Sequence, residues 1–156
     1  MAKRKLDERD REFSAEVYRA AAAERLAMLE TLYKTGLYTL ALYMAGVAVE
    51  CIFRAYRCKI DPSFDSRHDL YELAKAANFQ QLFLPGEIGD YEMARFEIAG
   101  RWSNNHRYRS DAAVRAFLRR SRLNRGIKGD YLKQNTRRAI DAAYFLVTVG
   151  LKKWKR

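Results

Sequence analysis

Residues 37–56 read LYTLALYMAGVAVECIFRAY, and this stretch decides the fold class of the chain. Its apolar residues surround the helix that they would form, and such a helix either lies in a protein core or crosses a membrane. The run from Leu37 to Phe53 approaches membrane-spanning length, but Glu50 interrupts it. We therefore expect residues 37–59 to form a buried core helix. Part of its surface carries only small residues, which allow a neighbouring helix to approach closely: Ala41, Ala45, Gly46 and Ala48.

The segments on either side of this core helix are also predicted to be helical. Upstream, residues 11–34 place apolar side chains close to a 3.6-residue spacing, and Thr35-Gly36 ends that helix. Downstream, Asp61-Pro62 ends the core helix, because the residue before a proline avoids the helical conformation. The stretch Ser66-Arg67-His68-Asp69 is typical of a capping box with Ser66 as N-cap, and it predicts a short helix to about residue 78.

Turn and capping residues bound the remaining predicted elements. They are a turn at Leu84-Pro85-Gly86, a weakly helical segment over 87–99 that ends at Gly100, a basic helix from Ser110-Asp111 to Asn124, a loop at Gly126 and Gly129, and a final helix capped by Asp130. No segment has the alternation of a strand, and no internal repeat is present. The sequence predicts one all-α domain over residues 1–156, a helical bundle with two long central helices.

The positive charge is concentrated in one part of the chain. The net charge is +11, and residues 101–138 carry 12 basic and two acidic residues, whereas residues 1–100 are slightly acidic. A local excess of this size attracts phosphate backbones or an anionic membrane, and the alternative is a solvated face that keeps the protein soluble. The arginine-rich composition favours a nucleic acid. The basic tail over 152–156 leaves a peripheral membrane contact as a lesser alternative, and we expect no membrane partner.

The cysteines and histidines exclude several classes of site. Cys51 and Cys58 lie about two helical turns apart, roughly 10 Å, so they cannot pair with each other and they fit a reducing compartment. Residues 1–12 are highly charged and do not resemble a secretory signal, so we expect a cytoplasmic protein. The two histidines and two cysteines have no metal-ligand spacing, and no phosphate-binding glycine loop is present. We therefore expect neither a metal nor a cofactor.

Three segments carry a resemblance to a known family. Residues 43–55, YMAGVAVECIFRA, are similar to the helix A-G-Y-A-V-E-x-x-x-K-A, His68-Asp69-Leu70-x-x-Leu73 is similar to H-D-L-x-x-L, and Trp102-x4-Arg107-Tyr108 is similar to W-x4-R-Y. The three patterns that these segments resemble are those of the HEPN superfamily, the higher eukaryotes and prokaryotes nucleotide-binding domain. The resemblance implies a four- to five-helix bundle, a homodimer, and an RNA-linked role in bacterial toxin or defence systems.

Some HEPN proteins are metal-independent ribonucleases that use an arginine followed, after four to six residues, by a histidine. Arg101-x4-His106 fits this motif. A histidine can exchange a proton with the ribose 2′-hydroxyl or the leaving oxygen, and an arginine can stabilise the charge on the phosphate. The alignment through Trp102, Arg107 and Tyr108 makes His106 incidental instead. The alternative function is then a non-catalytic module that binds nucleic acid or a partner such as a minimal nucleotidyltransferase.

Several other residues are candidates for this site. Glu50 either pairs with Arg54 or, as a buried acid, orients an arginine or histidine of residues 101–108. His68 is expected on the surface in the first turn of a helix. Asn104 and Asn105 are candidate supporting residues. The candidates for phosphate and base contacts are Arg107, Tyr108, Arg109, Arg115, Arg119, Arg120, Arg122 and Arg125. Arg115, Arg119 and Arg122 are expected to share one helix face.

Overall fold

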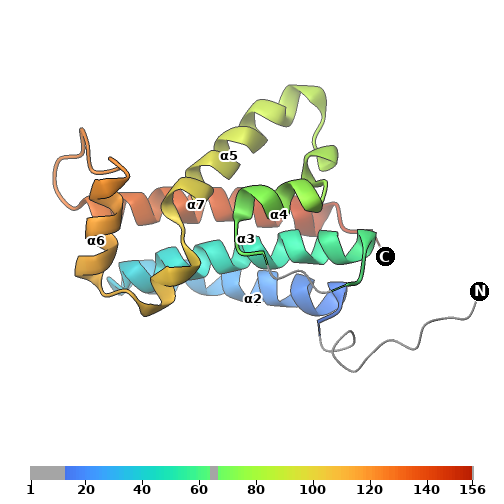
Figure 1. Ribbon diagram of the computed structural model, residues 1–156, viewed down its shortest axis with the longest axis horizontal. Helices are drawn as coiled ribbons and strands as arrows, with labels where there is room; N and C mark the ends of the chain where they lie inside the picture. Colours follow the sequence, from blue (N-terminus) through green and yellow to red (C-terminus); the bar gives the residue numbers. More distant parts are fainter. Residues whose placement is uncertain (1–12, 64–66, 156) are drawn as a thin grey trace, which may run out of the picture.

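Three long helices form the body of the protein. The computed structural model describes residues 13–63 and 67–155, and in these residues every regular element is helical. Helices α2 (Ala15–Lys34), α3 (Tyr38–Ile60) and α7 (Tyr131–Lys152) run along the long axis of the molecule, with α3 packed against both of the others (Figure 1). The all-α bundle predicted from the sequence is confirmed.

Helix α3 is the core helix, as its all-round apolar pattern predicts. Ala45, Val49 and Ile52 are fully buried, and the hydroxyl of Tyr56 donates a hydrogen bond to the carbonyl of Gly150 on α7, at 2.6 Å. By length and composition α3 could cross a membrane, but 61% of its most apolar window is buried inside the bundle. A helix that meets neighbours on most of its surface must be apolar on most of its surface.

Local capping residues bound these helices; the ends at Gly36 and Asp130 were predicted, whereas α2 begins after Ser14 and not at the predicted residue 11. The Ser14 side chain accepts a hydrogen bond from the Val17 amide at the start of α2, and Gly36, with φ +77°, ends the turn after it. The Asp130 side chain accepts from the Lys133 amide at the start of α7. Each of these contacts spans three residues or fewer, so the nearby sequence determines it.

The start of one smaller helix and the end of another differ from the prediction. Helix α4 (Leu70–Ala76) begins after Asp69, which is its N-cap; the predicted cap, Ser66, lies outside the described residues. Helix α5 (Ile88–Arg101) continues through Gly100 and ends one residue later, where Trp102 adopts an extended conformation. Gly100 keeps a helical φ, so the glycine is tolerated inside the helix and does not end it.

The described residues form six α-helices rather than four or five. The sixth helix is α6 (Asp111–Arg120), and short 3₁₀ turns η1 (Phe79–Leu82), η2 (Pro85–Glu87) and η3 (Asn104–Tyr108) connect the smaller helices. Figure 1 shows α5 inclined to the three long helices and α6 at one end of the bundle. Segment η3 connects α5 to α6 and packs against α3.

Candidate nucleic-acid interface

Trp102 anchors the start of the basic segment to the core. Its indole is buried, and Nε1 donates a hydrogen bond to the carbonyl of Tyr43 on α3, at 3.0 Å. The ring lies directly against Gly46, where an added Cβ would be 1.9 Å from the indole Cδ1. The small residues of α3 therefore admit an indole ring at this position. Trp102 is a packing residue and does not present a face for base stacking.

His106 lies inside the protein beneath η3. His106 is only 1% exposed. Its ring packs edge-on against the Phe117 ring, with the two centroids 4.7 Å apart. Nε2 donates a hydrogen bond to the carbonyl of Arg101, at 2.9 Å, and Nδ1 accepts one from the guanidinium of Arg109, at 3.1 Å. Burial lowers the pKa of His106, and the nearby positive charge of Arg109 lowers it further. The ring is thus held neutral with both nitrogens bonded.

The Arg101 side chain points into the contact between α5 and α7. Its Nε donates to the amide oxygen of Asn135, at 2.9 Å, and its NH1 donates to the Glu97 carbonyl at 3.0 Å and lies 2.7 Å from the Glu97 carboxylate. Burial lowers the pKa of this guanidinium. Asn135 in turn donates to the carbonyls of Leu123 and Tyr131. Arg101 is therefore a buried polar link between helices.

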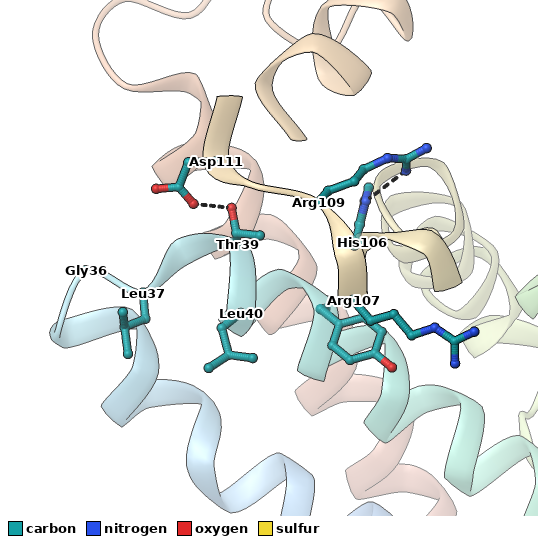
Figure 2. A pocket seen from close by; sticks show the side chains of 9 residues that line it. Gly36, Leu37, Thr39, Leu40, His106, Arg107, Arg109 and Asp111 are labelled. Carbon is teal, nitrogen blue, oxygen red and sulfur yellow. Dashed lines mark hydrogen bonds between the residues drawn. The ribbon is translucent and has the colours of Figure 1, made fainter. Parts of the chain in front are cut away.

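The predicted pair Arg101 and His106 does not form a cleft with two side chains. The His106 ring contacts the main-chain oxygen of Arg101, while the guanidinium binds α7. A pocket of about 320 Å³ lies beside η3, lined by Leu40, Tyr43, Arg107 and other residues, and the edge of His106 lines it too, whereas Arg101 does not. Figure 2 shows Arg109 turned back onto His106 and Arg107 extended on the other side of the segment.

Segment η3 presents three polar residues to solvent. Arg107 and Asn105 are exposed, and Tyr108 is 79% exposed. The Arg107 guanidinium lies 4.6 Å from the centre of the Tyr108 ring. Asn104 is half-buried at the start of the turn. A planar cation beside an exposed aromatic ring can contact a phosphate and stack on a base.

Arg115 and Arg119 share one face of α6, as predicted, but that face is turned toward the start of α7. Arg115 pairs with Asp130 at 3.0 Å, and its guanidinium lies 5.3 Å from the Tyr131 ring centre. Arg119 donates to the Tyr131 hydroxyl at 2.6 Å. Both side chains hold the loop between α6 and α7, and Arg119 remains exposed.

The expectation that Arg122 shares this face is wrong. Helix α6 ends at Arg120, and Arg122 has a φ of +59° in the turn that follows. The Leu123 amide donates to the Leu118 carbonyl and the Arg122 amide to the Arg119 carbonyl, both at 2.9 Å, which is a Schellman C-cap. The turn directs Arg122 away from the helix register, and its side chain is exposed.

Exposed cations remain around this turn. Arg120, Arg122 and Arg125 are exposed, and in the described part of the chain no carboxylate pairs with them. Lys128 lies exposed in the same loop. Figure 1 shows this loop and α6 at one end of the bundle. We call Arg107, Tyr108, Arg120, Arg122 and Arg125 the basic end. Arg120 and Arg125, which the sequence predicts as candidates for phosphate contacts, belong to it.

Glu50 contacts neither Arg101 nor any residue of η3. Its buried carboxylate lies 3.1 Å from the Arg54 guanidinium and 2.6 Å from Nδ1 of His68. The prediction of a pair with Arg54 is confirmed. The alternative, that Glu50 orients an arginine or histidine of residues 101–108, is wrong, because its carboxylate binds His68, which lies just before α4.

Two residues in the sequence indicated that a distant residue packs or binds there, but the sequence did not indicate which residue. A glycine in an apolar helix interior marks a close approach, and Gly46 receives Trp102. An asparagine in the apolar stripe of a helix needs buried partners, and Asn135 binds Arg101. Which partner each residue meets depends on how the helices pack.

Trp154 packs the described part of the basic C-terminal tail against the bundle. Trp154 Nε1 donates to Glu16 at 3.0 Å, and the Lys59 ammonium lies 3.8 Å from the Trp154 ring centre.

Cys51 and Cys58 are both free thiols, as their spacing predicts. Among residues 13–63 and 67–155, no three His, Cys, Asp or Glu side chains gather as metal ligands would.

Comparison of the chain with models of protein families, with curated proteins and with solved structures finds no match.

Proposed function

We propose that the protein is a HEPN-type RNA-binding protein whose basic end holds the phosphate backbone. The observation that carries this proposal is the group of exposed guanidinium groups at Arg120, Arg122 and Arg125, which have no carboxylate partner among residues 13–63 and 67–155. Unpaired cations on a surface bind an anionic polymer by releasing its counterions. At the other end of α6, Tyr108 and Arg107 supply a ring and a cation for one unpaired base and its phosphate.

In this proposal, Arg101 and His106 position the binding segment. His106 holds the main chain of η3 through Arg101 and the side chain of Arg109, and Trp102 ties the same segment to α3. For His106 to exchange a proton with RNA, its ring would first have to break its hydrogen bond to the Arg101 carbonyl or the one from the Arg109 guanidinium. The geometry therefore favours RNA binding at this end over cleavage by the Arg101–His106 pair.

The test is the salt dependence of RNA affinity. The dissociation constant for a fluorescently labelled single-stranded RNA is measured by anisotropy over a range of KCl concentrations. Each phosphate contact contributes about 0.7 to the slope of log K against log salt, so replacing three contacting arginines lowers the slope by about 2. The variant carries Arg120→Gln, Arg122→Gln and Arg125→Gln together.

The matched control removes the same charge elsewhere, on α2, α4 and α7, with Arg25→Gln, Lys75→Gln and Lys152→Gln. All three of these side chains are exposed or partly exposed and lie away from the basic end. The control is expected to keep the wild-type slope. A wild-type affinity that does not respond to salt, or equal slopes in both triple variants, would refute binding at the basic end.

We further propose that the protein is a homodimer through the outer face of α5. Met93 and Phe96 are 60% and 71% exposed, and Gly89 and Gly100, also exposed, lie four residues outside them. The order glycine, large apolar residue, large apolar residue, glycine is therefore the same from either end of the helix. An antiparallel copy therefore places Gly89 against Gly100 and Met93 against Phe96, as the two-fold symmetry of a homodimer requires. The Arg95 guanidinium lies over the Tyr71 ring, and this cation–π pair borders the face.

The mass in solution tests this face. Phe96→Ser is expected to convert a dimer to a monomer in sedimentation equilibrium, whereas Ile60→Ser, at another exposed apolar residue, leaves the dimer intact. A monomeric wild type, or a dimer that survives Phe96→Ser, would contradict the proposed face. The minimal nucleotidyltransferase partner stays a prediction of the alternative function, and the genes adjacent to this one are the first place to test it.

A further inference from the structure

Glu50 and His68 form a carboxylate–imidazole pair outside the basic end. Nδ1 of His68 lies 2.6 Å from Oε1 of Glu50, and because a carboxylate only accepts, the ring nitrogen donates. The Glu50 side chain is about 10% exposed, whereas the His68 side chain is 49% exposed. The buried acid therefore fixes the ring at Nδ1, and Nε2 has no hydrogen-bond partner in the described residues.

Arg54 also binds the Glu50 carboxylate. Its NH2 lies 3.1 Å from the same Oε1 and also donates to the main-chain oxygen of Arg67, the residue before His68. The guanidinium faces the ring of Tyr18 on α2 at 5.9 Å. One arginine thus binds both the carboxylate and the chain that carries the imidazole. This arrangement holds the carboxylate and the histidine in place relative to each other.

The pair lies on the same side of α3 as the segment that carries Arg107 and Tyr108. Tyr43 and Glu50 are two helical turns apart, about 11 Å along the axis, and share a face. Burial raises the pKa of Tyr43, the charge of Arg107 opposes that increase and the charge of Glu50 adds to it. Tyr43 is therefore close enough to both to experience their charges. An RNA strand bound at Arg107 can continue along this face to His68.

We propose that His68 is a catalytic general base for metal-independent RNA cleavage, positioned by Glu50; this rests on the RNA-binding function proposed above. Nε2 takes the proton of a ribose 2′-hydroxyl, and the 2′-oxygen forms a bond to the adjacent phosphorus. The bond from phosphorus to the 5′-oxygen breaks, and that oxygen takes a proton from water. The products are a 2′,3′-cyclic phosphate and a 5′-hydroxyl. The imidazolium, next to the Glu50 carboxylate, returns its proton to solvent.

The experiment measures cleavage of a labelled RNA in EDTA by the full-length protein. Wild type is expected to yield 2′,3′-cyclic phosphate ends, and RNA with 2′-O-methyl groups is expected to resist. His68→Gly is expected to lose at least about 100-fold in rate, as removal of a general base does, with RNA affinity unchanged. Imidazole added to the buffer restores cleavage by His68→Gly, which a structural role for the histidine would not predict.

Glu50 is tested as a positioning residue in the same assay. Glu50→Gln is expected to lower the rate at saturating RNA without changing RNA affinity, and to reduce the rescue of His68→Gly by imidazole. Glu72→Gln is the matched control, because Glu72 is exposed on α4 one turn away, and it is expected to cleave normally. Circular dichroism checks that each variant is folded.

The outcomes separate the two proposals. Salt-dependent RNA binding without any cleavage by wild type overturns the role of His68 and leaves the RNA-binding function standing. Cleavage that persists in His68→Gly without imidazole also overturns it. Absence of RNA binding overturns the proposed function itself and, with it, this inference.

Discussion

Gly46→Ala tests the packing that positions the RNA-binding segment. In wild type the new Cβ would lie 1.9 Å from Cδ1 and 2.1 Å from Cγ and Nε1 of Trp102, so the indole has to leave α3. Full loss of a buried tryptophan side chain costs about 3–5 kcal/mol, and alanine gains about 1 kcal/mol over glycine inside a helix. The displaced ring keeps part of its contacts. We therefore expect a net loss of about 2 kcal/mol in the free energy of unfolding.

A second background reverses the sign of this effect. In Trp102→Ala the clash is absent, and only the gain in helix propensity remains, so Gly46→Ala is expected to stabilise that protein by about 1 kcal/mol. The coupling between the two positions is then about 3 kcal/mol, which is large for a pair in direct contact but within the observed range.

Urea unfolding followed by far-ultraviolet circular dichroism provides the four free energies, since tryptophan fluorescence would change with Trp102 itself. RNA affinity provides a second measurement, because expelling the indole releases the chain that carries Arg107 and Tyr108. Gly46→Ala that stabilises the protein in both backgrounds would refute the contact between Gly46 and the indole.

Three further predictions concern the buried polar groups and the turn after α6. His106 has a folded pKa below its unfolded value of about 6.5, so the folded state binds fewer protons; its contribution is fully present above that pH and is lost as pH falls, by at most about 1.4 kcal/mol per pH unit. The difference in unfolding free energy between wild type and His106→Gln, measured from pH 7 to pH 5, should therefore shrink, and a constant difference would contradict the buried neutral ring. Asn135→Ala leaves Nε of buried Arg101 without its acceptor and should cost about 3 kcal/mol in urea unfolding; a loss below 1 kcal/mol would show that water replaces the amide. Arg122→Gly relieves a left-handed residue and should raise the unfolding free energy by about 0.5–1 kcal/mol, whereas Arg122→Ala should not; equal effects of both would contradict the strained turn.

The sequence predicted the helices well where capping residues and hydrophobic periodicity agree. Ser110 and Asp130 cap α6 and α7 at the predicted residues, and α3 is buried as its composition requires. These features depend on contacts within one or two turns, which a linear pattern contains. The end of α6 was misjudged because a left-handed arginine occupies a position where glycine is usual, so no local signal marked the turn.

The candidate site depended on contacts between distant residues, and the sequence pattern was weaker there. The spacing of Arg101 and His106 suggested convergent side chains, but the structure directs the arginine into α7 and the histidine onto a main-chain carbonyl. Spacing along the chain does not determine which way two side chains turn at the end of a helix. The concentration of charge after Gly100 was visible, yet only the fold shows which arginines are paired and which are exposed.

The amino-acid sequence by itself determined that this chain is helical, which of its helices is buried, and where most of its positive charge lies. Those properties follow from short-range sterics, capping and the removal of apolar side chains from water. Only the tertiary structure decided that Trp102 packs on Gly46, that His106 is enclosed, and that His68 meets Glu50. The physical reason is that a partner many residues away is selected by the packing of whole helices, and no local pattern encodes that choice.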